Sequence, residues 1–251
     1  MKLKLDRFDP DTLPLGSITL CQGRRNTGKS TILKSLMLAL KDKIDVCVAM
    51  TPTQSSADFF RSVMPPQLVY DKGIELGVIE TLLTIQRELI ANGKRRECLL
   101  LLDDVSYDKQ AFRSAVLGDA WRNGRHAAVT IILTSQACYD LPPDLRSNTD
   151  LIFALRDPII QNRKKLHLAY FGQLPFDSFT QCFEACTDSF GSIVLNQTLP
   201  TNSADDCLFW YRAKPTVPPF KMCNKAIWTL ALRPPPPPKD VQQLEVHVAS
   251  V

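Results

Sequence analysis

The chain has 251 residues, of which 45% are hydrophobic and 22% charged, and its formal net charge is +4. These values are typical of one globular α/β domain with appendages, and no apolar run is long enough to span a bilayer. The mild charge does not by itself indicate a dedicated nucleic-acid-binding protein, and residues 1–7 alternate charge with leucine, which excludes a secretory signal. We expect an intracellular protein without a membrane span.

Strand-like and helical patterns alternate along the chain after a short arm at residues 1–14. Buried strands are predicted at 18–21, 44–50, 97–102, 127–134 and 151–155, with shorter ones at 68–70 and 208–212. Helices are predicted at 31–38, 54–63, 74–92, 108–123, 157–170 and 176–189, and a short helix restarts at Pro142-Pro143. The alternation predicts an α/β fold whose mostly parallel central sheet is flanked by helices, with ligands at the carboxyl ends of the strands.

The first strand and helix enclose a phosphate-binding loop. Residues 23–30, Gly-Arg-Arg-Asn-Thr-Gly-Lys-Ser, match the pattern G-x-x-x-x-G-K-[ST] at every fixed position. In such a loop the backbone N–H groups face a polyphosphate, Lys29 reaches the β- and γ-phosphates, and the Ser30 hydroxyl ligates Mg²⁺. We therefore predict ATP binding by Gly23, Arg24, Arg25, Asn26, Thr27, Gly28, Lys29, Ser30 and Thr31. A glycine-rich structural turn is the alternative.

A second nucleotide signature follows the strand at 97–102, where four leucines lead into Asp103 and Asp104. Asp103 is predicted to hold Mg²⁺ beside Ser30, and Asp104 to orient and deprotonate the attacking water. The alternative is that both carboxylates cap the turn before Val105.

Two further residues are candidates for catalysis. Gln136 ends a strand that we expect between the loop strand and the Asp-Asp strand, where its amide would contact the γ-phosphate and the water, unless it only caps the strand. Arg125 precedes the amino end of the same strand, so we expect it to serve a neighbouring subunit as an arginine finger. Its alternative is to offset a helix dipole after Gly124.

Eight cysteines are scattered along the chain. Half of them lie in or beside apolar runs, namely Cys21, Cys47, Cys98 and Cys138. A free thiol there behaves as a small buried hydrophobe, which fits a reducing compartment. A zinc site would have to draw on Cys182, Cys186, Cys207 and Cys223, whose spacing matches no common ligand pattern.

Three short stretches bear on partners and boundaries. The basic runs 94–96 and 163–165 would contact DNA phosphates or simply form solvated faces. Proline is frequent from Lys214 onward and culminates in Pro234–Pro238, a polyproline II stretch that cannot join a core. We therefore predict an arm at 1–14, an ATPase domain at 15–214 and a proline-rich extension at 215–251, with a disordered tail at 234–251.

With the whole order in view, residues 15–214 resemble the genome-packaging ATPases of large eukaryotic DNA viruses, the poxvirus-type branch of the FtsK/HerA superfamily. The resemblance rests on the phosphate loop, on Leu-Leu-Leu-Leu-Asp-Asp at 99–104, on Asn-Gly-Arg-His at 123–126 and on the strand ending at Gln136. It rests also on residues 141–148, on Asn-Arg-Lys-Lys at 162–165 and on Phe-Trp-Tyr-Arg-Ala at 209–213.

The resemblance implies a RecA-like P-loop NTPase that uses ATP and Mg²⁺, assembles into a homo-oligomeric ring of five or six subunits, and moves double-stranded DNA into a capsid. It implies viral capsid components as partners, and the host cytoplasm, a viral factory or the virion as the location. Asp104 stands where the wider superfamily often has Glu, and Ala137-Cys138 stand where the viral proteins usually carry an aromatic residue. A nucleoside or nucleotide kinase and an ATP-binding scaffold without turnover are the alternative functions.

Overall fold

The structure is a computed structural model that describes residues 4–137, 139–201 and 203–231. Within those residues, nine strands form one sheet. From one edge to the other their order is β1 (Asp6–Arg7), β9 (Leu208–Tyr211), β8 (Ser192–Asn196), β7 (Leu151–Leu155), β2 (Ile18–Gln22), β6 (Val129–Ser135), β5 (Cys98–Leu102), β3 (Val46–Met50) and β4 (Val69–Tyr70).

Six neighbouring strands, from β7 to β4, are parallel, whereas β8 runs antiparallel to both β7 and β9. The predicted α/β class with a mostly parallel central sheet is therefore confirmed. The central strands are buried on both faces because helices cover the sheet above and below, as the predicted apolar runs require. The strand that ends at Gln136 lies between the loop strand and the Asp-Asp strand, as predicted.

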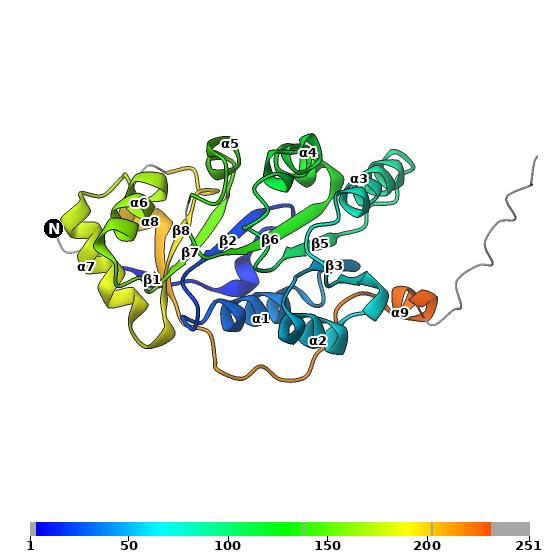
Figure 1. The fold of residues 1–251 in the computed structure, drawn as a ribbon, viewed down its shortest axis with the longest axis horizontal. Coiled ribbons are helices and arrows are strands. Elements are labelled where there is room, and N and C mark those ends of the chain that lie inside the picture. Colours follow the sequence, from blue (N-terminus) through cyan, green and yellow to red (C-terminus); the bar gives the residue numbers. More distant parts are fainter. Residues whose placement is uncertain (1–3, 138, 202, 232–251) are drawn as a thin grey trace, which may run out of the picture.

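The helices form a layer on each face of the sheet (Figure 1). One layer contains α1 (Lys29–Leu40) and α2 (Gln54–Val63), which pack on side chains such as Cys21, Leu99 and Leu101. The other face packs against α3 (Leu76–Ala91), α4 (Ala115–Asn123), α5 (Pro143–Ser147), α6 (Ile160–Tyr170) and α7 (Phe176–Thr187). Neighbouring residues of β5 alternate between the two layers, as the period of a strand demands.

Several elements differ from the sequence-based expectation. Strands β1 and β8 and the short helices α8 (Ala204–Cys207) and α9 (Lys225–Ala231) were not predicted. The helix predicted at 108–123 begins only at Ala115, because the Ser114 hydroxyl caps it by accepting from Leu117 N at 3.2 Å. Short 3-10 helices occupy Pro10–Thr12, Pro66–Leu68, Ala111–Arg113, Gly124–Ala127 and Asp188–Phe190.

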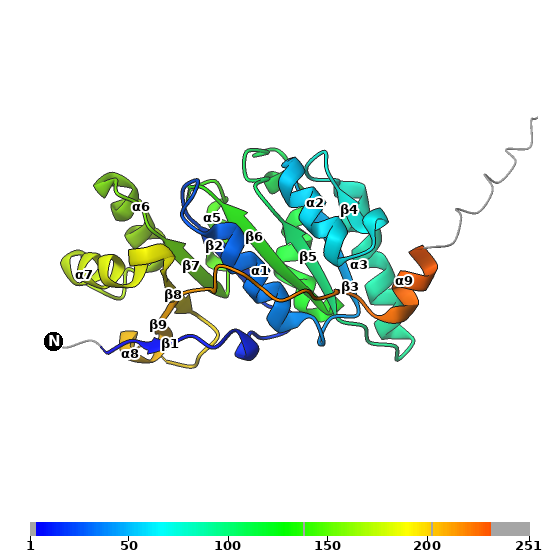
Figure 2. The same cartoon turned by 90° about the horizontal axis from the view of Figure 1, so that it is seen from below.

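Both end segments pack against the body of the molecule. In the predicted arm, β1 pairs with β9, and Phe8 and Leu13 are buried beside α1. After β9 the chain crosses α1 on its way to α9, as Figure 2 shows, and on this path Phe220 and Met222 join the core. The domain boundaries at 15 and 214 remain a prediction, and the tail at 234–251 lies outside the described residues.

Candidate nucleotide site

The phosphate loop connects β2 to α1 through two residues in the left-handed region, Asn26 with φ 60° and Gly28 with φ 107°. Gly23 begins the loop in close contact with its surroundings. A methyl group built on Gly23 would lie 2.7 Å from Thr27 Oγ1 and 2.8 Å from Leu155 Cβ, so only glycine fits there. The sequence pattern therefore folds into a tight loop whose last residues open a helix, which is the geometry that binds an anion through backbone N–H groups.

Lys29 lies inside this loop. Its Nζ donates to Gly23 O at 2.6 Å and to Arg24 O at 3.0 Å. Burial lowers the pKa of Lys29, while the nearby Asp104 and Asp103 carboxylates oppose that shift. The lysine and the two aspartates predicted for the site are thus close enough to interact electrostatically.

Asp103 is fixed at the end of β5, where its side chain is buried. The hydroxyl of Thr134, on the adjacent strand β6, donates to Asp103 Oδ1 at 2.7 Å. Its other oxygen receives only a long contact from Thr51 Oγ1 at 3.5 Å. Asp103 Oδ2 therefore retains most of its capacity to accept a further ligand.

Asp104 and Gln136 contact each other across the ends of β5 and β6. Asp104 has φ 55°, an unusual conformation for a residue with a side chain, and its N–H donates to Thr134 Oγ1 at 2.9 Å. The Gln136 amide nitrogen donates to Asp104 Oδ1 at 2.8 Å. The two residues that were predicted to handle the attacking water are therefore brought together.

Asp140, which the sequence reasoning missed, joins the loops after these two strands. Its Oδ2 accepts from Ser106 Oγ at 3.0 Å, from Ser135 Oγ at 2.9 Å and from Ala137 N at 3.1 Å. Asp140 therefore positions the chain around Gln136. An acidic residue just after a strand end was the only available signal.

Two cavities flank the phosphate loop. One, of about 370 Å³, is lined by Arg24, Arg25, Thr27, Gln136, Arg156, Pro158 and Asn162. The other, of about 260 Å³, is lined by Asn26, Thr27, Arg156, Thr187, Asp188, Ser189 and Phe190.

Arg156 lines both cavities and was also missed from the sequence. It is exposed and directly follows β7, which pairs with the loop strand β2. The predicted strand at 151–155 would have indicated it, since parallel strands end at one edge of a sheet.

Arg125 lies at the opposite end of the parallel strands, where their amino ends are. It belongs to the 3-10 turn before β6, is exposed, and its Cα lies 3.1 Å from where a methyl group on Gly16 would be. Gly16 precedes the amino end of β2, whereas the phosphate loop follows its carboxyl end. This placement separates Arg125 from the phosphate loop of its own chain, as predicted from the sequence.

Three of the six residues in the two basic runs form ion pairs. Arg95 contacts Glu97 at 2.6 Å and Arg96 contacts Asp45 at 3.5 Å. Arg163 is nearly buried and links α6 to α7 through Glu184 at 2.5 Å. Arg163 therefore holds two helices together and is not available as a surface contact for DNA.

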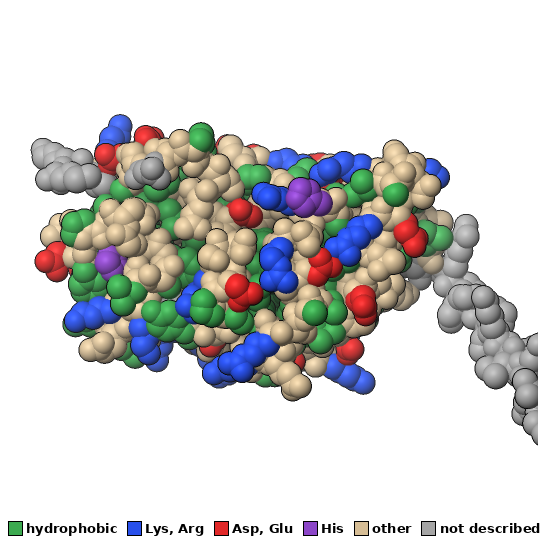
Figure 3. Space-filling model, turned by 90° about the horizontal axis from the view of Figure 1, so that it is seen from above, with side chains coloured by type: hydrophobic (Ala, Val, Ile, Leu, Met, Phe, Trp, Pro, Cys, Tyr) green, Lys and Arg blue, Asp and Glu red, His purple; other side chains and the backbone are tan. Residues whose placement is uncertain are grey.

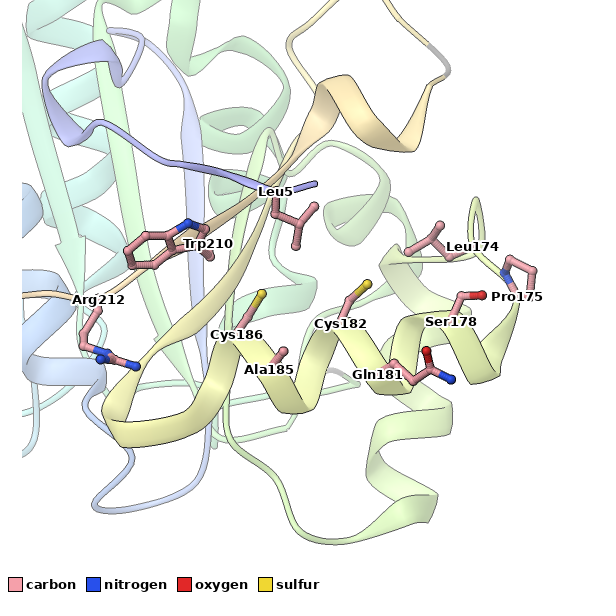
Figure 4. A pocket seen from close by; sticks show the side chains of 10 residues that line it. All are labelled: Leu5, Leu174, Pro175, Ser178, Gln181, Cys182, Ala185, Cys186, Trp210 and Arg212. Atoms are coloured by element: carbon pink, nitrogen blue, oxygen red, sulfur yellow. The ribbon is translucent and has the colours of Figure 1, made fainter. Parts of the chain in front are cut away.

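The seven cysteines within the described residues are free. Cys182 and Cys186 share one face of α7 and line a cavity of about 660 Å³ beside Trp210 (Figure 4). The described part of the chain contains no group of three or more His, Cys, Asp or Glu side chains able to hold a metal ion. Burial raises the pKa of Cys186 to about 12, as expected of an inert thiol.

The sequence matches the family described as poxvirus A32 protein over residues 10–156. That match covers more than half of the chain and includes the phosphate loop, both aspartates and Gln136. The chain belongs to the poxvirus A32 family. The resemblance to the poxvirus-type packaging ATPases is thereby confirmed.

Relatives of this A32-family chain occur in several viruses. It is 32% identical over 200 residues to protein 075L of Invertebrate iridescent virus 6, a match that covers 78% of this chain and 74% of the relative. Among solved structures it is similar to B204, the DNA-packaging ATPase of Sulfolobus turreted icosahedral virus, with a TM-score of 0.59 and 17% identity over 80% of this chain and 100% of B204.

A second similar structure is the genome-packaging NTPase B204 of Sulfolobus turreted icosahedral virus 2, in complex with AMPPCP. Its TM-score is 0.58, its identity 19%, and the match covers 83% of this chain and 100% of that one. At these identities the two structures establish a common fold. No helix in the described part of this A32-family chain is long and apolar enough to cross a membrane.

Proposed function

We propose that this A32-family chain is the ATP hydrolase of a viral motor that drives double-stranded DNA into a capsid. The observation that carries the proposal is the convergence of Lys29, Asp103, Asp104 and Gln136 at the carboxyl edge of the sheet, beside the phosphate loop. The packaging role is supported by membership of the A32 family and by the shared fold with B204, a DNA-packaging ATPase.

The loop binds the triphosphate through its backbone. The N–H groups at the start of α1 face the phosphates, and the helix dipole favours their negative charge. Lys29 would exchange its two contacts with loop carbonyls for contacts with the β- and γ-phosphates. Its lowered pKa reflects the cost of burying its charge, which bound phosphates would offset.

The residues also fit a magnesium ion. Mg²⁺ prefers hard oxygen ligands, and the site offers the Ser30 hydroxyl and the incompletely used Oδ2 of Asp103. When bound, the ion would neutralise charge that develops on the phosphates. Asp103 is held by Thr134, so its orientation does not depend on the ion.

For hydrolysis, Asp104 would accept a proton from the attacking water as its oxygen bonds to the γ-phosphorus and the bond to the ADP oxygen breaks. The Gln136 amide, which already donates to Asp104 Oδ1, would position that water and contact the γ-phosphate. Their direct pairing connects the state of the nucleotide with the loop after β6.

The DNA, the ring of five or six subunits and the capsid components are further parts of the proposal. We place this work in the host cytoplasm, a viral factory or the virion. Figure 3 shows acidic and basic side chains interspersed on one face of the molecule, without a continuous basic patch. We propose that assembly brings together basic groups from several subunits to contact DNA.

The test is ATP hydrolysis by the purified full chain, with and without duplex DNA. Lys29→Ala and Asp104→Asn should each lower kcat at least about 100-fold, since they remove a phosphate ligand and a general base. Lys72→Ala and Asp205→Asn change exposed side chains of the same types and should leave kcat within twofold of the wild type, the spread expected of remote surface changes.

Unchanged hydrolysis in both site variants would contradict the proposal. Tight ATP binding without phosphate release would indicate a scaffold, and phosphate transfer to a nucleoside would indicate a kinase.

A further inference from the structure

The turn after α7 is strained next to the phosphate loop. Ser189 and Phe190, with φ 49° and φ 63°, both lie in the left-handed region, which side chains disfavour. Two such residues in succession persist only where the surrounding contacts hold them.

The surrounding contacts do hold this turn. The Asp188 carbonyl accepts from Gly191 N at 2.9 Å and from the Arg212 guanidinium at 3.0 Å. Figure 4 shows Arg212 extending from β9 toward the end of α7. A methyl group on Gly191 would lie 2.1 Å from Cys186 O, so only glycine can close the turn. The turn is therefore a built feature of the fold.

The turn presents an aromatic ring to the loop. Phe190 is 66% exposed, whereas Phe153, Phe179 and Phe183 are buried. A methyl group on Gly28 would lie 3.5 Å from Phe190 Cβ and 3.7 Å from its Cδ1. The cavity of about 260 Å³ lies between this turn, Asn26, Thr27 and Arg156. An exposed aromatic face beside a cavity is a surface on which a planar ligand can stack.

The two cavities can be assigned to the two ends of a nucleotide. The cavity of about 370 Å³ is lined by Gln136, whose amide donates to Asp104 Oδ1, so we assign it to the γ-phosphate and the water. If the triphosphate lies along the loop, the base extends away from the γ-phosphate and requires a different cavity. The cavity beside Phe190 also touches the loop but is not lined by Gln136.

We propose that Phe190 is the stacking platform for the base of the bound nucleoside triphosphate. This inference rests on the proposed ATP binding and deepens it, because it assigns the part of the site that recognises a nucleoside. Stacking buries an apolar ring that is otherwise in water, and the strained turn keeps that ring in place before the ligand arrives.

The test compares MgATP with magnesium tripolyphosphate, which has the phosphates but no base, by titration calorimetry on the full chain. Phe190→Ala should weaken MgATP binding about tenfold and leave tripolyphosphate binding unchanged. Alanine tolerates a positive φ no better than phenylalanine does. The substitution therefore removes the aromatic ring without relieving the backbone strain of the turn. Phe190→Tyr should restore MgATP affinity.

Leu168→Ala is the matched control, because Leu168 is a 75% exposed apolar side chain on α6. Equal MgATP affinity in Phe190→Ala and the wild type would overturn the inference, as would an equal loss for both ligands. If the wild type binds neither ligand, the proposed function itself is contradicted. This outcome is distinct from a failure of the stacking inference, in which the wild type still binds MgATP.

Discussion

At the scale of single residues, one hydroxyl contacts both aspartates of the site. Thr134 Oγ1 donates to Asp103 and accepts from the N–H of Asp104. A hydroxyl has one hydrogen and two lone pairs, so it can make both bonds at once. The φ of 55° at Asp104 sets the direction in which its side chain and the following chain leave this hydrogen-bonded peptide. Thr134 thereby contacts the side chain of Asp103 and the backbone of Asp104.

A second residue, Asp150, gives the molecule a pH-dependent contribution to stability. Burial raises its pKa above the ordinary 3.8, although a hydrogen bond from Ile18 N at 2.8 Å and the charge of Arg125 oppose the shift. The folded state therefore binds the Asp150 proton more tightly than the unfolded state. Its contribution to stability is present below pH 3.8 and is lost as the pH rises through the folded pKa.

Asp150→Asn should remove this loss, because an amide oxygen can still accept from Ile18 N. Relative to the wild type, the free energy of unfolding of the variant should rise from pH 3 to pH 7. Urea unfolding at a series of pH values measures the difference.

Asp119 provides the control of opposite sign. Hydrogen bonds from Asn123 and Arg87 lower its pKa, so its stabilisation is present above the ordinary 3.8 and is lost as the pH falls through the folded pKa. Asp119→Asn should therefore lose stability relative to the wild type as the pH rises. If the difference in the free energy of unfolding between Asp150→Asn and the wild type stays constant with pH, the raised pKa of Asp150 is refuted.

At the scale of elements, the phosphate loop depends on contact between its first glycine and the neighbouring strand. Gly23 approaches both Thr27 of the loop and Leu155 at the end of β7. The loop is therefore shaped by the sheet as well as by its own sequence.

Gly23→Ala should distort the loop and weaken MgATP binding at least about tenfold, because a contact of 2.7 Å forces the loop to move. Gly77→Ala is the control, since a methyl group there has no neighbour within 4 Å. Because Gly77 lies in helix α3, the Gly77→Ala variant should keep its MgATP affinity and have a free energy of unfolding that is higher by about 0.5–1 kcal/mol. Normal MgATP affinity in Gly23→Ala would show that the loop tolerates a side chain there.

The sequence was sufficient for elements whose evidence is local. The parallel strands and their helices follow from apolar runs and periodicity, and helix α2 was predicted with its observed bounds. Strand β1 contains only Asp6 and Arg7, and its pairing with Phe209 and Trp210 is visible only in three dimensions. The register that places Leu102 opposite Leu133, and so Asp103 near Thr134, is equally absent from a linear pattern. Phe190 lies in a turn whose conformation depends on Arg212 and Cys186.

At the scale of the whole molecule, the predicted catalytic residues are divided between the carboxyl ends and the amino ends of the parallel strands. Lys29, Asp104 and Gln136 lie at the carboxyl edge, and Arg125 lies at the amino edge. In a head-to-tail ring, an interface of this kind would place the Arg125 of one subunit at the loop of the next.

A mixing experiment tests this arrangement. Lys29→Ala and Arg125→Ala chains should each lack ATPase activity, but mixed rings should regain up to about a quarter of wild-type activity, because some interfaces combine an intact lysine with an intact arginine. Arg122→Ala, another exposed arginine in the preceding helix, should be active alone. Mixtures that stay inactive would argue that Arg125 does not act between subunits.

The pairing of β1 with β9 also has a consequence for synthesis on the ribosome. Asp6 and Arg7 find their partners in Phe209 and Trp210, roughly 200 residues later. At about 5–20 residues per second, the first strand emerges about 10–40 s before its partner exists. During that interval Phe8 lacks two of its aromatic neighbours, Phe209 and Tyr211. The edge of the sheet is therefore completed late in translation, after the nucleotide loop and both aspartates have already been made.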